Sequence, residues 1–138
     1  MTDNLTWLLT KNSSCFIVRR NGVEFAKEKF NLANRNCRKY SGLAAVKGCD
    51  LSLSNKKITL STKVAKRSNK PAQSCVAAPL NKCTQAASKA LDSQLSSNHY
   101  RSDLKKVAMA KWCLLNRVAQ VEKGSKKKTI CKTRGVQA

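Results

Sequence analysis

The segment CFIVRR-Asn21-Gly22-VEFAKE places the strongest constraint on the fold. Asn-Gly supplies the two positive φ angles of a type I′ turn, which joins two antiparallel strands with a matching twist. Phe16 and Val18 share one face of the first strand, and Val23 and Phe25 share one face of the return strand. The pattern therefore predicts a β-hairpin with the Arg19–Arg20 pair at its tip, where long cationic side chains reach outward.

A second pair of strands is predicted over VKGCDLSLS and KKITLSTKV. Leu51 and Leu53 alternate with polar residues, as do Ile58 and Leu60, which is typical of half-buried strands. Asn55 and Lys56 supply the turn between them. With the hairpin, these segments predict a small antiparallel sheet of about four strands with one buried face.

Three helices are predicted around this sheet. A short first helix would begin at Asp3 or Asn4 and bury Leu5, Trp7, Leu8 and Leu9. For Trp7 packing at the core or its rim is favoured, with base stacking as the alternative. A second helix is expected from residue 81 to about 98, its apolar positions being Cys83, Ala87, Ala90, Leu91 and Leu95.

The third helix should be the strongest and run from Ser102 or Asp103, either of which could cap it, to about Val121. At 100° per residue its apolar side chains fall within one arc, which also contains Lys111 without an explanation. The arc consists of Leu104, Val107, Ala108, Trp112, Leu114, Leu115, Val118 and Ala119. Gly124 is expected to end the helix.

These elements predict an α+β fold: a small antiparallel sheet followed by two or so C-terminal helices and a basic tail. Residues 1–121 would form one domain with a basic linker at 63–80, and residues 122–138 a basic extension. Only 29 of the 138 residues are Leu, Ile, Val or Phe. This is close to the fraction, roughly 20%, below which highly charged chains tend to be disordered, so the core should be thin.

The charge balance indicates the partner. There are 28 Lys and Arg against 7 Asp and Glu, a net charge of +21, and the cations are spread from Lys11 to Arg134. A polyanion relieves the resulting self-repulsion and releases counterions on binding. The pattern therefore favours a domain embedded in nucleic acid; a solvated basic surface or a membrane-surface protein is the alternative.

The stretch from Glu28 to Ala45 is predicted to be a basic loop at the centre of this surface. It contains Arg35, Arg38, Lys39 and Tyr40 and no acid after Glu28, while its Gly and Asn residues disfavour a regular element. Phe30, Leu32 and Leu43 would anchor its ends. Tyr40 could stack on an unpaired base or pack over the loop against Leu43.

Two further segments are strongly basic. The linker around Lys66, Arg67 and Lys70 carries no acid and would either lie along RNA or be a flexible loop; Pro71 and Pro79 exclude a continuous helix. The tail SKKKTICKTRGVQA could be an RNA-threading extension or a nuclear-import patch, or both.

Sites for other chemistry are not predicted. The seven cysteines lack the C-x₂₋₄-C spacing of zinc ribbons, and nothing local pairs the one histidine, His99, with a thiol. No nucleotide-binding motif or paired-carboxylate motif occurs. We therefore expect no catalysis, metal or cofactor. Without an apparent signal peptide or membrane span, the cysteines are expected to be reduced thiols in the cytosol or nucleus.

The order of several short motifs resembles the eukaryote-specific large-subunit ribosomal protein twenty-eight family. The resemblance is collinear from residue 7 to about residue 120 and comprises the early Trp, the SCFIVRR strand, the loop EKFNLANRNCRKYSGLA, the KPA segment and the YRSDL helix start. The matching positions are Trp7, Phe16 to Arg20, Asn31, Leu32, Asn36, Tyr40, Gly42, Leu43, Lys70, Pro71, Ala72, Tyr100, Arg101, Asp103 and Leu104.

The resemblance implies a structural, non-enzymatic protein of the cytoplasmic 60S subunit with an α+β fold. Its partners would be large-subunit rRNA, expansion segments among the possible contacts, and neighbouring ribosomal proteins, with nuclear and nucleolar transit during assembly. Ser102 replaces the family's usual proline, and seven cysteines are unusual. A related assembly factor, which uses clustered cysteines, and a DNA-binding chromatin protein are the alternatives.

On this reading, the RNA-binding residues are cations spread over the hairpin, loop, linker, third helix and tail, with one tyrosine. They are Arg19, Arg20, Arg35, Arg38, Lys39, Tyr40, Lys66, Arg67, Lys70, Arg101, Lys105, Lys106, Lys126, Lys127, Lys128, Lys132 and Arg134.

Overall fold

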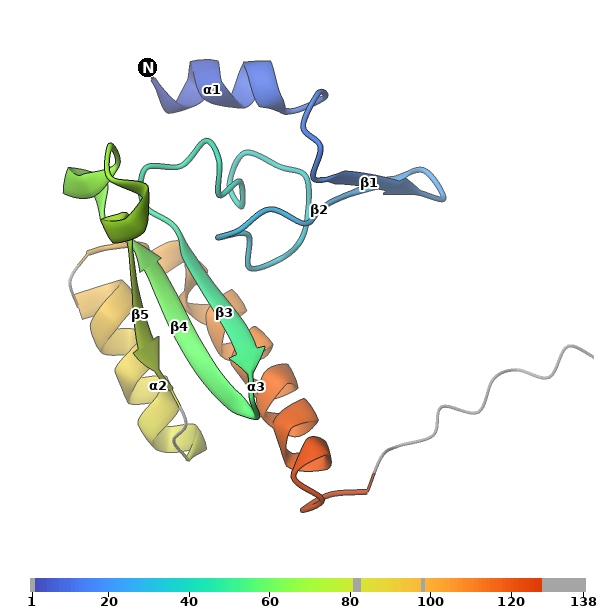
Figure 1. The fold of residues 1–138 in the computed structure, drawn as a ribbon, viewed down its shortest axis with the longest axis vertical. Helices are drawn as coiled ribbons and strands as arrows, with labels where there is room; N and C mark the ends of the chain where they lie inside the picture. The colour runs from blue at the N-terminus through green and yellow to red at the C-terminus, as the bar shows by residue number, and fades with distance from the viewer. Residues whose placement is uncertain (1, 81–82, 98, 128–138) are drawn as a thin grey trace, which may run out of the picture.

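The computed structural model describes residues 2–80, 83–97 and 99–127 (Figure 1). The α+β class is confirmed. In chain order the helices and strands are α1 (Asp3–Thr10), β1 (Ile17–Arg20), β2 (Val23–Ala26), β3 (Cys49–Ser54), β4 (Lys57–Lys63), β5 (Cys75–Pro79), α2 (Thr84–Asp92) and α3 (Lys105–Glu122). Short helical turns are η1 (Ala65–Arg67), η2 (Pro71–Gln73), the π-helical η3 (Ser93–Ser97) and η4 (Ser102–Leu104).

The four predicted strands are present, but they belong to two sheets. β1 and β2 form a separate hairpin, in which Val18 lies opposite Phe25 and the turn residues Asn21 and Gly22 have φ of 49° and 75°. The turn Asn55–Lys56 likewise joins β3 to β4 with positive φ at both residues. The single four-stranded sheet was wrong because the loop after β2 separates the hairpin from β3 (Figure 1).

The second sheet contains a fifth strand that the sequence analysis assigned to the basic linker. β5 pairs antiparallel with β4, and Lys63, the expected first residue of the linker, is the last residue of β4. Pro79 is tolerated because β5 is an edge strand, where a residue without an N–H need not complete a second ladder. The prediction of a linker over 63–80 is therefore wrong at both of its ends.

The core lies between this sheet and the two C-terminal helices. Figure 1 shows α2 and α3 against the same face of β3–β4–β5. Leu51 and Leu60, which lie opposite each other in the sheet, and Leu91 of α2 are all buried in one cluster with Trp112 of α3. Trp112 is 1% exposed, and its indole N–H donates to the Leu80 carbonyl at 3.1 Å.

Helix α3 uses a narrower apolar stripe than its sequence suggested. Leu104, just before the helix, Ala108 and Ala119 are buried as expected, but Leu114 and Val118 are exposed, Leu114 by 67%. The helix meets the sheet on one side only, so the margins of the predicted arc face solvent. Lys111, which the arc left unexplained, forms an ion pair with Asp50 of β3 at 2.8 Å.

The predicted helix starts needed correction. α1 begins at Asp3 but its N-cap position is Thr2, which makes no side-chain capping bond. α3 is preceded by η4, and Asp103 forms an ion pair with Arg101 instead of capping the helix. The end of α3 is as expected, because Gly124 has φ of +76° and its N–H bonds to the Val121 carbonyl.

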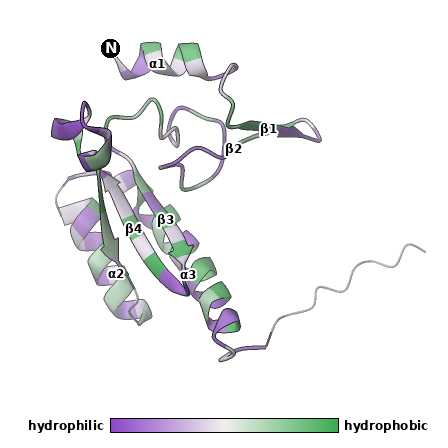
Figure 2. Ribbon diagram, in the orientation of Figure 1, coloured by the Kyte–Doolittle hydropathy of each residue, from purple (hydrophilic) through white to green (hydrophobic). Residues whose placement is uncertain are grey.

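Helix α1 is the least embedded of the three α-helices. It has no buried residue, and Trp7 is only half-buried. Leu5, Leu8 and Leu9, which were expected to be buried, are exposed. Figure 2 shows hydrophobic and hydrophilic colours alternating along α1, whereas the turns after β4 are largely hydrophilic.

Candidate nucleic-acid interface

The basic loop between β2 and β3 is organised by one buried carboxylate. Glu28 is buried, and its carboxylate accepts hydrogen bonds from Asn31 Nδ2 at 3.1 Å, Ser41 Oγ at 3.3 Å and the Leu43 backbone N–H at 3.3 Å. Asn31 also donates to the Arg35 carbonyl at 2.9 Å. Because a buried charge is costly unless hydrogen-bonded, these contacts hold both ends of the loop around Glu28.

Lys63 of β4 holds the same loop from the sheet. Its ammonium group donates to the carbonyl oxygens of Gly42 and Ala45 and lies 5.5 Å from the centre of the Phe30 ring. Burial lowers the pKa of Lys63, and the nearby charge of Glu28 partly opposes that shift. A cation and an anion therefore hold the backbone of the loop together beside its buried Phe30 and Leu32.

The loop backbone passes so closely over Phe30 that only glycine fits at residue 42. A Cβ at Gly42 would lie 1.9 Å from the Lys29 carbonyl oxygen and 2.9 Å from Phe30 Cβ. Phe30 and Leu32 are buried as expected, but Leu43 is exposed, so the prediction that it anchors the loop was wrong. Close backbone packing at Gly42 takes its place.

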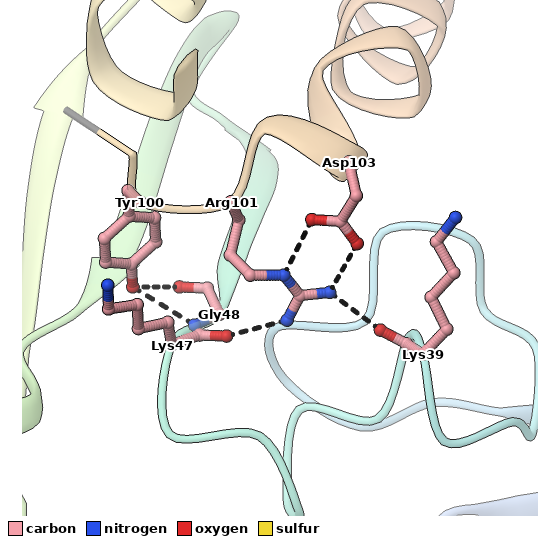
Figure 3. A network of polar contacts seen from close by, with 6 residues as sticks. All are labelled: Lys39, Lys47, Gly48, Tyr100, Arg101 and Asp103. Carbon is pink, nitrogen blue, oxygen red and sulfur yellow. Dashed lines mark hydrogen bonds and ion pairs between the residues drawn. The ribbon is translucent and has the colours of Figure 1, made fainter. Parts of the chain in front are cut away.

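Tyr100 and Arg101 join the loop to the start of α3 (Figure 3). The Tyr100 hydroxyl accepts a hydrogen bond from Gly48 N–H at 3.1 Å and lies 2.8 Å from the Lys63 carbonyl oxygen and 2.9 Å from that of Gly48, to which it can donate. Burial raises the pKa of Tyr100. The phenol therefore remains neutral and links Gly48, just before β3, to the end of β4.

The Arg101 guanidinium makes four hydrogen bonds within the protein. Nε and Nη2 donate to the two carboxylate oxygens of Asp103 at 2.9 and 3.0 Å, Nη1 to the Lys47 carbonyl at 2.9 Å and Nη2 to the Lys39 carbonyl at 2.8 Å (Figure 3). The hydrogen bond and charge of Asp103 raise the pKa of Arg101, and Arg101 lowers that of Asp103. Arg101 thus has internal partners on three sides, and its predicted contact with RNA stays a prediction.

This framework leaves the loop cations facing outward. Arg35, Arg38 and Lys39 are exposed on the surface of the loop. Arg38, Lys39 and Arg101 line a cavity of about 480 Å³ with Asp3 and Asp103. Tyr40 is half-buried and packs against the hydrophobic core, with Lys39 Nζ 5.7 Å from its ring centre. Of its two predicted roles, packing therefore describes its position, although its partner is the core.

The remaining predicted cations lie on separate elements. Arg19 is ion-paired to Glu24 at 2.8 Å, and Lys105 to Asp92 at 2.7 Å, so two of them already have acidic partners. The others with described positions are exposed: Arg20 of β1, Lys66 and Arg67 of η1, Lys70 before η2, Lys106 of α3, and Lys126 and Lys127 after it. Lys128, Lys132 and Arg134 lie outside the described residues.

Sequence reasoning missed the residues that build the loop from within. Glu28 had a signal, since it is the only acid of its stretch; Lys63 had none, and Tyr100 stood out only as part of the YRSDL motif. The partners of Lys63 and Tyr100 are 18 to 52 residues away in the sequence, and only the folded chain brings them together.

The described thiols show no sign of a metal centre. Over residues 2–80, 83–97 and 99–127, no three His, Cys, Asp or Glu side chains are grouped so as to hold a metal ion. No helix in that part of the chain is long and apolar enough to cross a membrane. Burial raises the pKa of the Cys49 thiol from 9.0 to about 11.

This shift predicts that the Cys49 thiol reacts most slowly with alkylating reagents among the described cysteines of the native protein. Each pKa unit changes the thiolate fraction tenfold, so its thiolate population near pH 8 should be about 100-fold below that of an ordinary thiol. Alkylation followed by peptide mass spectrometry should modify the exposed Cys15, Cys83 and Cys113 first and Cys49 only on unfolding. Modification of Cys49 at the rate of Cys113 in the folded protein would contradict its position in the core.

Comparison with known proteins identifies the family. A model of the Ribosomal L28e protein family matches residues 5–118. Large ribosomal subunit protein eL28 of Caenorhabditis elegans is 33% identical over 131 residues, covering 94% of this chain and 98% of that protein. The Dictyostelium discoideum protein of the same name is 36% identical over 74 residues, covering 54% and 56%, and the Schizosaccharomyces pombe one is 26% identical over 120 residues, covering 80% and 87%. The chain therefore belongs to the Ribosomal L28e protein family.

Proposed function

We propose that this chain is a structural, non-catalytic constituent of the large subunit of the cytoplasmic ribosome, where it binds large-subunit rRNA through phosphate contacts and lies beside other ribosomal proteins. Its relatives in three organisms are named as large ribosomal subunit proteins. A net charge of +21 suits a protein that is surrounded by phosphate. Assembly would take it through the nucleus and nucleolus before it reaches the cytoplasm.

The observation that carries this proposal is that some charged side chains bind the backbone of the loop from within while its arginines are exposed to solvent. Glu28, Lys63 and Arg101 fix its backbone from within, while Arg35 and Arg38 are exposed. A loop that is already ordered loses less conformational entropy on binding, so more of the electrostatic attraction appears as affinity. Arginine can also bind phosphate through two parallel hydrogen bonds.

The proposed phosphate-binding set follows from these positions. Residues 1–121 would be the rRNA-binding domain and residues 122–138 a basic extension that adds affinity. Arg101 is assigned to support the loop, and Tyr40 to pack against the core. The phosphate-binding candidates are Arg20, Arg35, Arg38, Lys39, Lys66, Arg67, Lys70, Lys106, Lys126 and Lys127, with Arg19 and Lys105 shared with their acidic partners and Lys128, Lys132 and Arg134 in the extension.

Sedimentation of a cell extract through a sucrose gradient tests the proposed function. The chain should sediment with mature large subunits, whole ribosomes and polysomes. Recovery only with nucleolar precursors would indicate an assembly factor, and recovery with chromatin would indicate a DNA-binding protein. Either result would overturn the proposal.

The loop itself is tested by the salt dependence of RNA binding. The slope of log K against log salt is negative for binding through phosphates. Changing Arg35→Ala together with Arg38→Ala should reduce its magnitude by about two units, because each lost phosphate contact removes close to one. The matched control is Arg19→Ala with Lys105→Ala, which removes the same charge from two side chains that already form ion pairs. The control should reduce the magnitude of the slope by less. Equal slopes for the wild type and the loop variant would show that these arginines do not meet phosphate.

A further inference from the structure

The hairpin exposes an aromatic face that the proposed role of phosphate binding does not explain. The register places Val18 opposite Phe25 and Arg20 opposite Val23, and side chains alternate between faces along each strand. Val18, Val23 and Phe25 therefore share one face, and Phe16, just before β1, continues it because the Lys27 N–H donates to the Phe16 carbonyl at 2.9 Å. The other face carries Ala26, which is 3% exposed, and its half-buried partner Ile17, whereas Val23 and Phe25 are exposed by 51% and 40%.

Phe25 lines a hollow beside the hairpin. The hollow has a volume of about 490 Å³ and is lined by Val18, Arg20, Phe25, Ala26, Lys27 and Asn34. This volume lies within the range of about 300–1,000 Å³ of small-molecule sites. Phe25 is 40% exposed, so its ring is available for contact, and the amide of Asn34 can donate and accept hydrogen bonds at the edge of the hollow.

The charges around the hollow favour one kind of occupant. Arg20 and Lys27 lie among its lining residues, and none of the lining residues is acidic. The acid of the hairpin, Glu24, faces the opposite side, where it binds Arg19 at 2.8 Å and Asn36 Nδ2 at 2.8 Å. An exposed aromatic ring that lines the same hollow as two cations matches a nucleotide, whose base can stack while its phosphates are neutralised.

We propose that this hollow is a stacking site for an unpaired RNA base, in which Phe25 contacts the base while Arg20 and Lys27 bind the flanking phosphates. The proposal rests on the proposed function and adds a ligand class to it, a single-stranded nucleotide. A double helix does not fit this role, because its bases are already stacked and its A-form major groove is too narrow for side chains to enter.

The test compares two RNAs against matched variants of the full chain. The probes are a short unstructured single-stranded oligoadenylate and a blunt duplex RNA of the same length. Phe25→Ala should weaken binding of the single strand by about 5- to 150-fold, the range that corresponds to loss of one base–aromatic stack, and leave duplex binding within about twofold. Phe25→Tyr keeps an aromatic ring and should restore single-strand affinity.

The control is Phe16→Ala. Phe16 is on the same face and equally exposed, at 41%, but does not line the hollow. It should leave binding of both RNAs unchanged, and urea unfolding of each variant would show whether the hairpin remains folded.

Three results would overturn the proposal. If the wild type binds RNA but Phe25→Ala binds the single strand equally well, the stacking site is wrong while the proposed function stands. If Phe25→Ala retains RNA affinity but is lost from large-subunit particles, the face contacts a protein neighbour. If the wild type binds neither RNA, the proposed phosphate contacts fail as well.

Discussion

Trp112→Ala is expected to lower the free energy of unfolding by about 3–5 kcal/mol, the range for truncating a fully buried tryptophan. Trp112 is 1% exposed, packs among residues from the sheet, α2 and α3, and donates to the Leu80 carbonyl. A domain of this size is stable by only about 5–15 kcal/mol, so this one change should remove a large part of the total. Urea unfolding followed by circular dichroism measures it.

Two control variants separate the parts of this effect. Trp112→Phe keeps most of the buried area but leaves the Leu80 carbonyl without its indole partner, so a loss of about 1–3 kcal/mol is expected. Leu114→Ala removes an apolar side chain from the same helix at a position that is 67% exposed, and should change stability by less than about 0.5 kcal/mol. A larger loss for Leu114→Ala than for Trp112→Ala would mean that α3 presents a different face to the sheet.

Helix α3 shows which buried residues sequence periodicity can predict and which it cannot. Its apolar arc correctly placed Leu104, Ala108, Trp112 and Ala119 in the core. It wrongly added Leu114 and Val118, because periodicity gives the direction of the buried face but not its width. Width depends on how many elements cover the helix, and here a sheet and one short helix cover a single side.

Local rules were sufficient for the strands that have a turn signal. Asn21-Gly22 fixed the hairpin and its register, and the alternation of leucines identified β3 and β4. β5 had no such signal, since CVAAP contains small residues and a proline. It forms a strand because β4 offers an open edge, and that condition is created by the tertiary structure.

The exposed cations of the candidate interface could be predicted from the sequence, but the contacts that hold its loop in place could not. The exposure of Arg35, Arg38 and Lys39 followed from a run of cations without acids. The role of Arg101 did not, because the carbonyls that it binds lie 54 and 62 residues earlier in the chain. A cation count treats every arginine as available to phosphate, whereas the fold uses this one to hold the loop in place.

The variant Arg101→Ala tests whether Arg101 supports the loop instead of binding phosphate. It should lower the free energy of unfolding by about 2–3 kcal/mol through loss of charge-assisted hydrogen bonds. Arg101 is only 19% exposed and connects Asp103 to the Lys39 and Lys47 carbonyls. Arg101→Lys should recover little of this stability, because one ammonium group cannot reproduce four bonds from a planar fork. Arg38→Ala, at an exposed arginine lining the same cavity, should be nearly neutral for stability but weaken RNA binding.

The pH dependence gives an independent check on the same contact. Arg101 lowers the pKa of Asp103 in the folded protein. The pair therefore stabilises the fold at pH values above the pKa of Asp103 in the unfolded chain, which is near 4. This contribution is lost as the pH falls through the lowered pKa of the folded protein. The stability difference between wild type and Arg101→Ala should therefore shrink in acid. If Arg101 were instead a phosphate ligand, the lysine variant would keep much of the RNA affinity and both variants would unfold like wild type. Urea midpoints at neutral and acidic pH, measured beside RNA affinity, distinguish a residue that supports the loop from one that binds the RNA.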